Sequence, residues 1–318
     1  MEGVFSMWKR EWIAAVLALM LALSGCTPLV EDSPEALTVC ATFYPIYALT
    51  EPLTEGVPDL TLRCLVQPQD GCLRSYSLSD WDLYLLSSAD AVIAGGRGLE
   101  SFESMLFAMG DKGPAVSTLL YNLELQNSTR ERHDTSEEDS HLNGPNPHLY
   151  MSVDGAKRIV ESAAAMLQTL DPRFAQTYVD NEERAMERLD ALEAQMDEIA
   201  GNLNGRRAIL MNETLVYFAR DFGLEIAGQV DRESGEGLYD VELEETLEQM
   251  AGYDAGVVLI ERQAPRALVE ALEAHGYSVG LIDILSTHRA SDGFEGYIQA
   301  QINNARAIRR AFDGEATH

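Results

Sequence analysis

The chain has 318 residues, a hydrophobic content of 46% and a formal net charge of −29. This length is enough for one large or two modest hydrophobic cores. The charge argues against nucleic acid or anionic lipid as a partner, because both require a basic protein face. Two interpretations of the acidic surface remain open, namely attraction of cations and solubility alone.

The first 26 residues have the pattern of a secretory signal. The basic pair Lys9-Arg10 precedes an apolar run of about eleven residues at 13–23, whereas about 20 are needed to span a bilayer. The run ends in Leu-Ser-Gly ahead of Cys26, which resembles the bacterial lipobox. The alternative is a chance cysteine behind a plain signal peptide. We expect residues 1–25 to be removed and a lipid on Cys26 to hold the protein at the outer face of the cytoplasmic membrane.

Three further cysteines follow, in a compartment that permits disulfides. Cys64 and Cys72 are close enough in sequence to bridge across a short loop, but a free Cys72 is equally compatible with the sequence. Cys40 lies in an apolar run, so we expect a buried thiol in the core.

Short apolar runs alternate with helical stretches in two sets, and such runs are typical of buried parallel strands. The predicted strands are 37–43, 60–66, 89–94 and 115–118, then 207–211, 224–227, 255–260 and 278–282. The predicted helices are 78–88 (capped by Asp80), 99–109, 214–222, 241–250, 265–275 and 293–312. We therefore predict an α/β fold with a tether at 26–36, an N-terminal lobe at 37–170 and a C-terminal lobe at 205–313, each lobe a parallel sheet flanked by helices.

A long helix is predicted in the segment 171–204 that joins the lobes. From Phe174 to Leu203 the apolar residues recur in steps of three, four and seven, and no Gly or Pro intervenes before Gly201. A helix of about 30 residues would be about 45 Å long. Its stripe would suit either a coiled-coil dimer or a helix lying across two lobes, and its shortness favours the second, in a monomer.

The segment 121–147 has a different composition, poor in apolar residues and rich in Asp, Glu, Ser and Asn. It is either a solvated spacer or a mobile arm whose carboxylates, with His133 and His141, collect cations.

Several segments, taken in order, resemble the solute-binding lipoproteins of zinc and manganese ABC importers. They are Thr42-Phe-Tyr-Pro-Ile-Tyr47, Tyr76 to Asp82, Leu85 to Ile93, Gly95 to Phe102, Asn146-Pro-His-Leu-Tyr150 and Asp171-Pro172. The resemblance covers 39–312. It implies two lobes joined by one long rigid helix, a metal ion held in the cleft by side chains of both lobes, and small closure motions.

The resemblance assigns first-lobe ligands only in part. His148 matches the family's histidine in the Asn-Pro-His segment, although a hydrogen-bonded structural histidine is the alternative. The family's other first-lobe histidine is replaced by Arg74, whose guanidinium cannot bind a metal ion. Cys72 could supply a thiolate instead, or Arg74 could pair with a carboxylate and seal the cleft.

In the second lobe the resemblance points to carboxylates at strand ends. The family's third ligand aligns with Asn212, beside Glu213, unless Asn212 caps a helix that Glu213 begins. Asp283 aligns with the final carboxylate, and Glu261 ends the preceding strand. The accessory candidates are His288 (otherwise a surface or capping histidine), Glu233, Arg74, His133 and His141.

These features predict a non-enzymatic binding protein. The resemblance implies capture of Zn²⁺, with Mn²⁺ as the alternative, and delivery to an ABC permease driven by its ATPase. The alternative function is a cell-surface interaction or adhesion lipoprotein of the same fold that no longer binds metal. The sequence contains no H-E-x-x-H, G-x-S-x-G or Walker-type motif, which argues against an enzyme.

Overall fold

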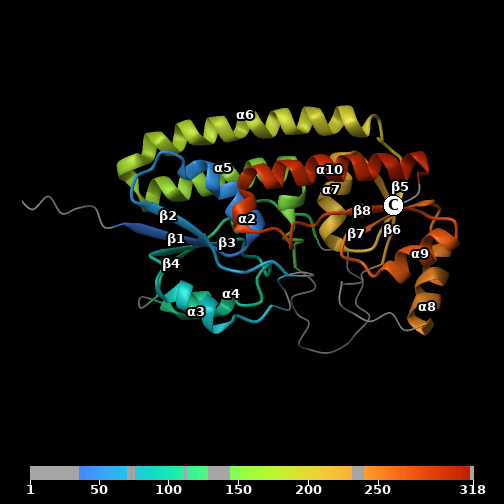
Figure 1. Cartoon of the computed structure of the whole chain (residues 1–318), viewed down its shortest axis with the longest axis horizontal. Coiled ribbons are helices and arrows are strands. Elements are labelled where there is room, and N and C mark those ends of the chain that lie inside the picture. The colour runs from blue at the N-terminus through green and yellow to red at the C-terminus, as the bar shows by residue number, and fades with distance from the viewer. Residues whose placement is uncertain are drawn as a thin grey trace, which may run out of the picture. The chain divides into compact units, whose positions relative to one another are not determined.

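The computed structural model describes residues 36–69, 73, 76–110, 113–127, 144–230 and 240–315. Every helix and strand within these ranges belongs to one compact unit that begins at Leu37 (Figure 1). The predicted signal peptide, Cys26 and nearly all of the tether lie outside the described residues. In the part of the chain that is described, no helix is both long and apolar enough to cross a membrane.

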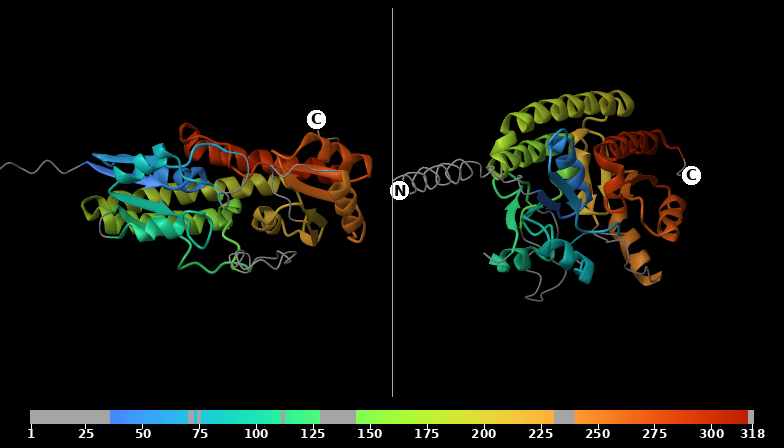
Figure 2. Two further views of the ribbon diagram at one scale, coloured as in Figure 1. Left: turned by 90° about the horizontal axis from the view of Figure 1, so that it is seen from below. Right: turned by 60° about the vertical axis from the view of Figure 1, so that its left-hand side comes forward.

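The first lobe contains a parallel four-stranded sheet in the order β2-β1-β3-β4. Its strands are β1 (Leu37–Ala41), β2 (Leu60–Cys64), β3 (Ala91–Ala94) and β4 (Ala115–Thr118). All four predicted strands of this lobe are confirmed. The inner strand β3 is buried along its whole length, as its unbroken apolar sequence predicts. In Figures 1 and 2 the sheet lies between a layer that contains α5 and α6 and a layer that contains α3 and α4.

The second lobe repeats this topology, with a parallel sheet in the order β6-β5-β7-β8. Its strands are β5 (Arg207–Leu210), β6 (Glu225–Gln229), β7 (Val257–Glu261) and β8 (Ser278–Ile282), which confirms the second set of predictions. Alternate residues of β5 point to opposite faces of the sheet. Ala208 and Leu210 pack in the large hydrophobic core that also contains first-lobe residues, and Ile209 packs in a smaller hydrophobic cluster of the second lobe.

The α-helices flank the sheets. They are α2 (Tyr44–Thr50), α3 (Asp80–Ser87), α4 (Glu103–Ala108), α5 (Val153–Leu170), α6 (Ala175–Ala200), α7 (Val216–Asp221), α8 (Asp240–Ala251), α9 (Arg266–Ala274) and α10 (Gly293–Asp313). Short 3-10 helices are η1 (Glu51–Thr54), η5 (Leu149–Met151), η6 (Pro172–Phe174), η7 (Glu213–Leu215) and η8 (Ala290–Asp292). Two of these helices, α2 and α5, were not predicted from the sequence.

The predicted cap of α3 is wrong. Ser79, with an extended backbone, is the N-cap, and its hydroxyl accepts from the Asp82 amide at 3.3 Å. The Asp82 carboxylate accepts in return from the Ser79 amide at 2.8 Å, which completes a capping box. Asp80 is already the first helical residue, so its side chain cannot take the capping position.

The long helix α6 has 26 residues and lies across both lobes (Figure 1). Near its start the buried Asn181 amide donates to Leu53 O at 2.6 Å and Glu55 O at 2.9 Å. At its end Arg309 of α10 donates to Ala200 O at 3.4 Å. The predicted class, two parallel-sheet lobes joined by one long helix, is therefore confirmed, and α6 spans the lobes as expected.

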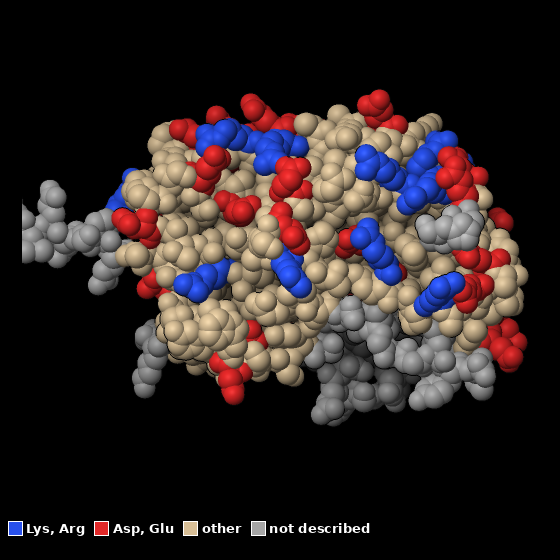
Figure 3. Space-filling model, in the orientation of Figure 1, with Lys and Arg blue, Asp and Glu red and all other residues tan. Residues whose placement is uncertain are grey.

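Several side chains of α6 form ion pairs with neighbouring helices. Lys157 of α5 lies 2.6 Å from both Asp190 and Glu193, and Arg188 lies 2.6 Å from Glu295 of α10. Figure 3 shows this alternation of basic and acidic side chains along the edge where α6 and α10 lie. Because the acidic partner in each pair is exposed, each pair adds little stability, about 0–1 kcal/mol.

The described cysteines are free thiols. Cys40 is fully buried in β1, as predicted. Cys64, in β2, donates to Val66 O at 3.5 Å and forms no disulfide. Its proposed partner Cys72 lies outside the described residues.

Substitution in the buried stripe of α6 tests whether this helix is part of the core. Leu189 is fully buried, so Leu189→Ala should lower the free energy of unfolding by about 2–5 kcal/mol through lost contacts and a cavity. The exposed Gln195 of the same helix gives a matched control, and Gln195→Ala should change the free energy of unfolding by less than about 0.5 kcal/mol. Urea denaturation measures both. Equal effects would contradict the packing role of α6.

Candidate metal centre

A small pocket lies between the two lobes. Its first-lobe lining is Phe43, Tyr44, Val66, Gln67, Gln69, Leu73, Leu99 and Tyr150. The second lobe contributes Thr214, Ile284, Ser286 and His288. The cavity volume open to the centres of water molecules is about 20 Å³, room for one or two waters or an ion. It lies at the carboxyl ends of the strands, where parallel sheets place ligands.

His148 is not itself one of the pocket-lining residues, but its ring packs against the pocket-lining Tyr150, with ring centroids 6.0 Å apart. His148 is 1% exposed, and its main-chain N–H donates to Asn146 Oδ1 at 3.0 Å. The ring nitrogen Nδ1 lies 2.9 Å from the same oxygen. Because an amide oxygen only accepts, Nδ1 is the donor in this contact and carries a proton, which leaves Nε2 as the ring nitrogen able to bind an ion when it is deprotonated. A lone pair on Nε2 is what a metal ion would bind.

Asn146 connects this histidine to the second lobe. Its amide nitrogen donates to Glu213 O at 2.9 Å, and its own carbonyl accepts from the Tyr217 hydroxyl at 2.9 Å. Asn146 is therefore a positioning residue, which the sequence analysis did not single out. The signal available was its place two residues before His148.

Asn212 and Glu213 lie where β5 ends. The Asn212 Oδ1 atom accepts from the Thr214 amide at 2.9 Å, so Asn212 caps η7, the alternative that the sequence left open. Glu213 begins η7 with its side chain buried, and its carbonyl accepts the bond from the first lobe.

Glu261 and Asp283 lie together at the ends of neighbouring strands. Glu261 closes β7 and pairs in register with Ile282, directly before Asp283. Both carboxylates are 2% exposed. The parallel sheet thus places two predicted acids at one edge, as expected from the strand order.

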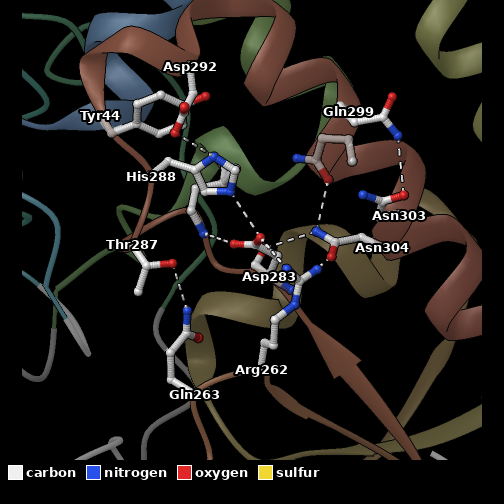
Figure 4. A network of polar contacts seen from close by, with 12 residues as sticks. Tyr44, Arg262, Gln263, Asp283, Thr287, His288, Asp292, Gln299, Asn303 and Asn304 are labelled. Carbon is white, nitrogen blue, oxygen red and sulfur yellow. Dashed lines mark hydrogen bonds and ion pairs between the residues drawn. The ribbon is translucent and has the colours of Figure 1, made fainter. Parts of the chain in front are cut away.

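The Asp283 carboxylate is fully engaged (Figure 4). Its Oδ2 lies 3.0 Å from His288 Nε2 and 3.1 Å from Arg262 Nη1, and its Oδ1 accepts from the Leu285 amide at 2.8 Å. Burial would raise the pKa of Asp283, but the hydrogen bond and charge of His288, the Leu285 amide and the Arg262 charge outweigh it and lower this pKa. Asp283 is therefore ionised.

His288 belongs to the pocket wall rather than to the exposed surface. Its ring stacks on Tyr44 of the first lobe, with ring centroids 4.9 Å apart and planes inclined by 19°. Its Nδ1 lies 3.5 Å from Asp292 Oδ2. The Tyr44 hydroxyl donates to Gly293 O at 2.9 Å, so this stack joins the lobes at Asp283.

The predicted ligands form two groups. In the first group, Asn146 hydrogen-bonds both the His148 ring and the Glu213 carbonyl. In the second group, the Asp283 carboxylate contacts the His288 ring directly. Within the described ranges, no three His, Cys, Asp or Glu residues gather closely enough to hold a metal ion. The predicted residues Cys72, Arg74, Glu233, His133 and His141 lie outside those ranges, so their roles stay predictions.

Glu100, which directly follows the pocket-lining Leu99, is a buried acid that was not predicted from the sequence as a site residue. It is 2% exposed and accepts from the Thr42 hydroxyl at 2.7 Å and from the Gly95 and Gly96 amides at 2.7 and 2.9 Å. Gly96 has φ +81, and a Cβ there would lie 2.9 Å from Thr118, so the turn requires glycine. An acid directly after the glycine-rich turn was the available signal.

Comparison with known proteins identifies the family. The family model described as "Zinc-uptake complex component A periplasmic" matches residues 39–311. The chain belongs to this family. The zinc-uptake component A family consists of extracytoplasmic solute-binding proteins that bind metal and serve ABC transporters. The prediction that the chain is not an enzyme is therefore confirmed.

Individual relatives of the zinc-uptake component A family are distant. The high-affinity zinc uptake system protein ZnuA of Bacillus subtilis is 22% identical over 230 residues, 70% of each chain. The zinc-binding lipoprotein AdcA of Streptococcus pneumoniae serotype 4 is 22% identical over 289 residues, 88% of this chain and 56% of AdcA. The solved structure of FpvC from Pseudomonas aeruginosa with Mn²⁺ has a TM-score of 0.75 at 21% identity, covering 88% of this chain and 99% of FpvC.

The buried Glu100 predicts a pH-dependent stability. Burial raises the pKa of Glu100 above its ordinary value, despite three hydrogen bonds that lower it. The protonated Glu100 therefore stabilises the folded chain fully at pH values below the carboxyl pKa of the unfolded chain, about 4.3. This stabilisation is lost as the pH rises through the higher pKa that Glu100 has in the folded chain. Glu100→Gln removes this titration, so the stability of the wild type relative to Glu100→Gln should fall as the pH rises from 4.5 to 8. Urea denaturation across this range measures it, and a constant difference would contradict the raised pKa.

Proposed function

We propose that this chain is the extracytoplasmic solute-binding lipoprotein of an ABC importer for a divalent transition metal, with zinc favoured over manganese. The observation that supports this most is His148. Its ring is buried beside Tyr150, which lines the interlobe pocket, and is oriented by Asn146, which is itself bonded to the second lobe. Binding of an ion at Nε2 would therefore be sensed by both lobes.

The donor types favour zinc. His148 offers an imidazole, a second imidazole (His288) lines the pocket, and the thiol of Cys72 is a further candidate. Nitrogen and sulfur donors suit zinc, whereas manganese prefers oxygen. Glu213, Glu261 and Asp283 would complete the site. Asn212, which was predicted as a ligand, has its side-chain oxygen bonded to the Thr214 amide. The accessory candidates outside the described residues are Arg74, Glu233, His133 and His141.

The proposed cycle requires little motion. The lobes are tied by α6 and α10, whose Tyr297 hydroxyl donates to Tyr150 O at 2.8 Å. An ion would be captured with a small closure and passed to the permease and its ATPase. A lipid on Cys26 would keep the monomer at the outer face of the cytoplasmic membrane.

One observation favours the second candidate, a cell-surface interaction lipoprotein that has lost metal binding. Asp283 is already paired with Arg262 and His288, as a cleft acid without a metal partner would be. The choice between the two functions depends on whether metal binds the folded chain.

A thermal melt with defined metals tests the proposal. The chain from Thr27 onward retains every described helix and strand, and after chelation it would be given Zn²⁺ or Mn²⁺ at equal excess. A ligand that binds only the folded state adds about 4 kcal/mol at a thousandfold excess over Kd. We expect a large rise in Tm with Zn²⁺ and a smaller one with Mn²⁺.

The matched variants are His148→Ala, which should abolish most of the zinc shift, and His275→Ala, which should preserve it. His275 is exposed at the end of α9, where its Nδ1 contacts Ala271 O. No shift with either metal would overturn the import proposal and favour the interaction lipoprotein.

A further inference from the structure

The side chain of Arg262 contacts the carboxylate that a metal ion at Asp283 would bind. Its Nη1 lies 3.1 Å from Asp283 Oδ2, the oxygen that His288 also contacts (Figure 4). The other oxygen accepts from the Leu285 amide. Because a carboxylate offers about four acceptor sites, three bound donors leave little of Asp283 for an incoming ion.

Asp283 itself cannot move away from these partners. Asn304 of α10 holds its backbone from both sides, accepting from the Asp283 amide at 2.8 Å and donating to the Asp283 carbonyl at 2.9 Å. The residue follows β8 directly and is 2% exposed. The carboxylate is therefore a fixed point of the second lobe.

Arg262 is the partner that can leave. Its main chain is held by a bond from its amide to Ile282 O at 2.8 Å, but its side chain is 49% exposed. A long, half-exposed guanidinium can rotate into water at low cost, since arginine keeps its charged head solvated. His288, by contrast, is stacked on Tyr44 and 19% exposed.

We propose that Arg262 is a specificity-determining residue, a tethered cation that competes with the metal ion for Asp283. This inference rests on the proposed function, with Asp283 as a ligand. A divalent ion and a guanidinium within about 4 Å of each other repel strongly in a partly desolvated cleft. Binding at Asp283 therefore requires Arg262 to swing out.

An ion must therefore bind strongly enough to displace the guanidinium of Arg262 from Asp283. Ions that bind nitrogen and carboxylate sites weakly, such as Mg²⁺ and Ca²⁺, gain too little to displace the guanidinium. Transition ions high in the stability order, including zinc, gain enough. Arg262 thus filters the abundant hard cations, which an acidic surface would otherwise attract.

The test compares metal affinities of three variants in the chain from Thr27 onward, by competition with a chromophoric chelator. Arg262→Gln removes the charge and should tighten Zn²⁺ binding about 3- to 10-fold and introduce measurable Ca²⁺ binding. Arg262→Lys keeps the charge and should stay close to the wild type. The control is Arg266→Gln, an exposed arginine that pairs with Glu270 on α9 and should change nothing.

The Tm of the metal-free protein shows whether Arg262 competes with metal or has only a structural role. Arg262→Gln should lower the Tm of the metal-free protein, since Asp283 loses a partner, and enlarge the rise in Tm on adding Zn²⁺. A structural role alone would lower the metal-free Tm and leave Kd unchanged or weaker, which would overturn the inference. Failure of the wild type and all variants to bind metal would instead overturn the proposed function and this inference with it. Binding by Arg262→Gln alone would support competition and contradict import by the wild type.

Discussion

The packing of α6 and α10 across both lobes is the constraint on which the rest of the structure depends. Asn181 fixes the start of α6 to the first lobe, and Arg309 joins its end to α10. Tyr297 and Gln301 of α10 reach back to carbonyls of η5, next to His148. With two continuous helices shared between the sheets, the interlobe distance is set by rigid rods rather than by flexible strands.

A fixed interlobe distance keeps the pocket between the lobes small. The pocket has room for an ion or one or two waters, so affinity depends on which side chains reach it. His288 lines the pocket and is held by Asp283 and Tyr44, whereas His148 lies behind the pocket-lining Tyr150 and is held by Asn146. Orientation of this kind removes much of the ordering cost that binding would otherwise carry.

The buried acids of this region are stabilised in different ways. Glu100 accepts only neutral donors, so burial dominates and its pKa rises. Asp283 is as deeply buried but meets an imidazole and a guanidinium, so its pKa falls. Two buried carboxyl groups thus differ in charge because of their neighbours: Glu100 has a raised pKa, and Asp283 is ionised. This contrast explains why Asp283, rather than Glu100, is the better ligand candidate.

Local patterns determined most of the fold. The eight apolar runs became the eight strands of the two sheets, and the 3.6-residue stripe after Phe174 became α6, because periodicity is a property of neighbouring residues. Motif resemblance selected His148 and Asp283. Three features were not predicted from the sequence: the pairing of Asp283 with Arg262, the Asn146 bond to Glu213 and the burial of Glu100. These contacts join residues far apart in the chain, so only strand order and lobe packing decide which charges and amides meet.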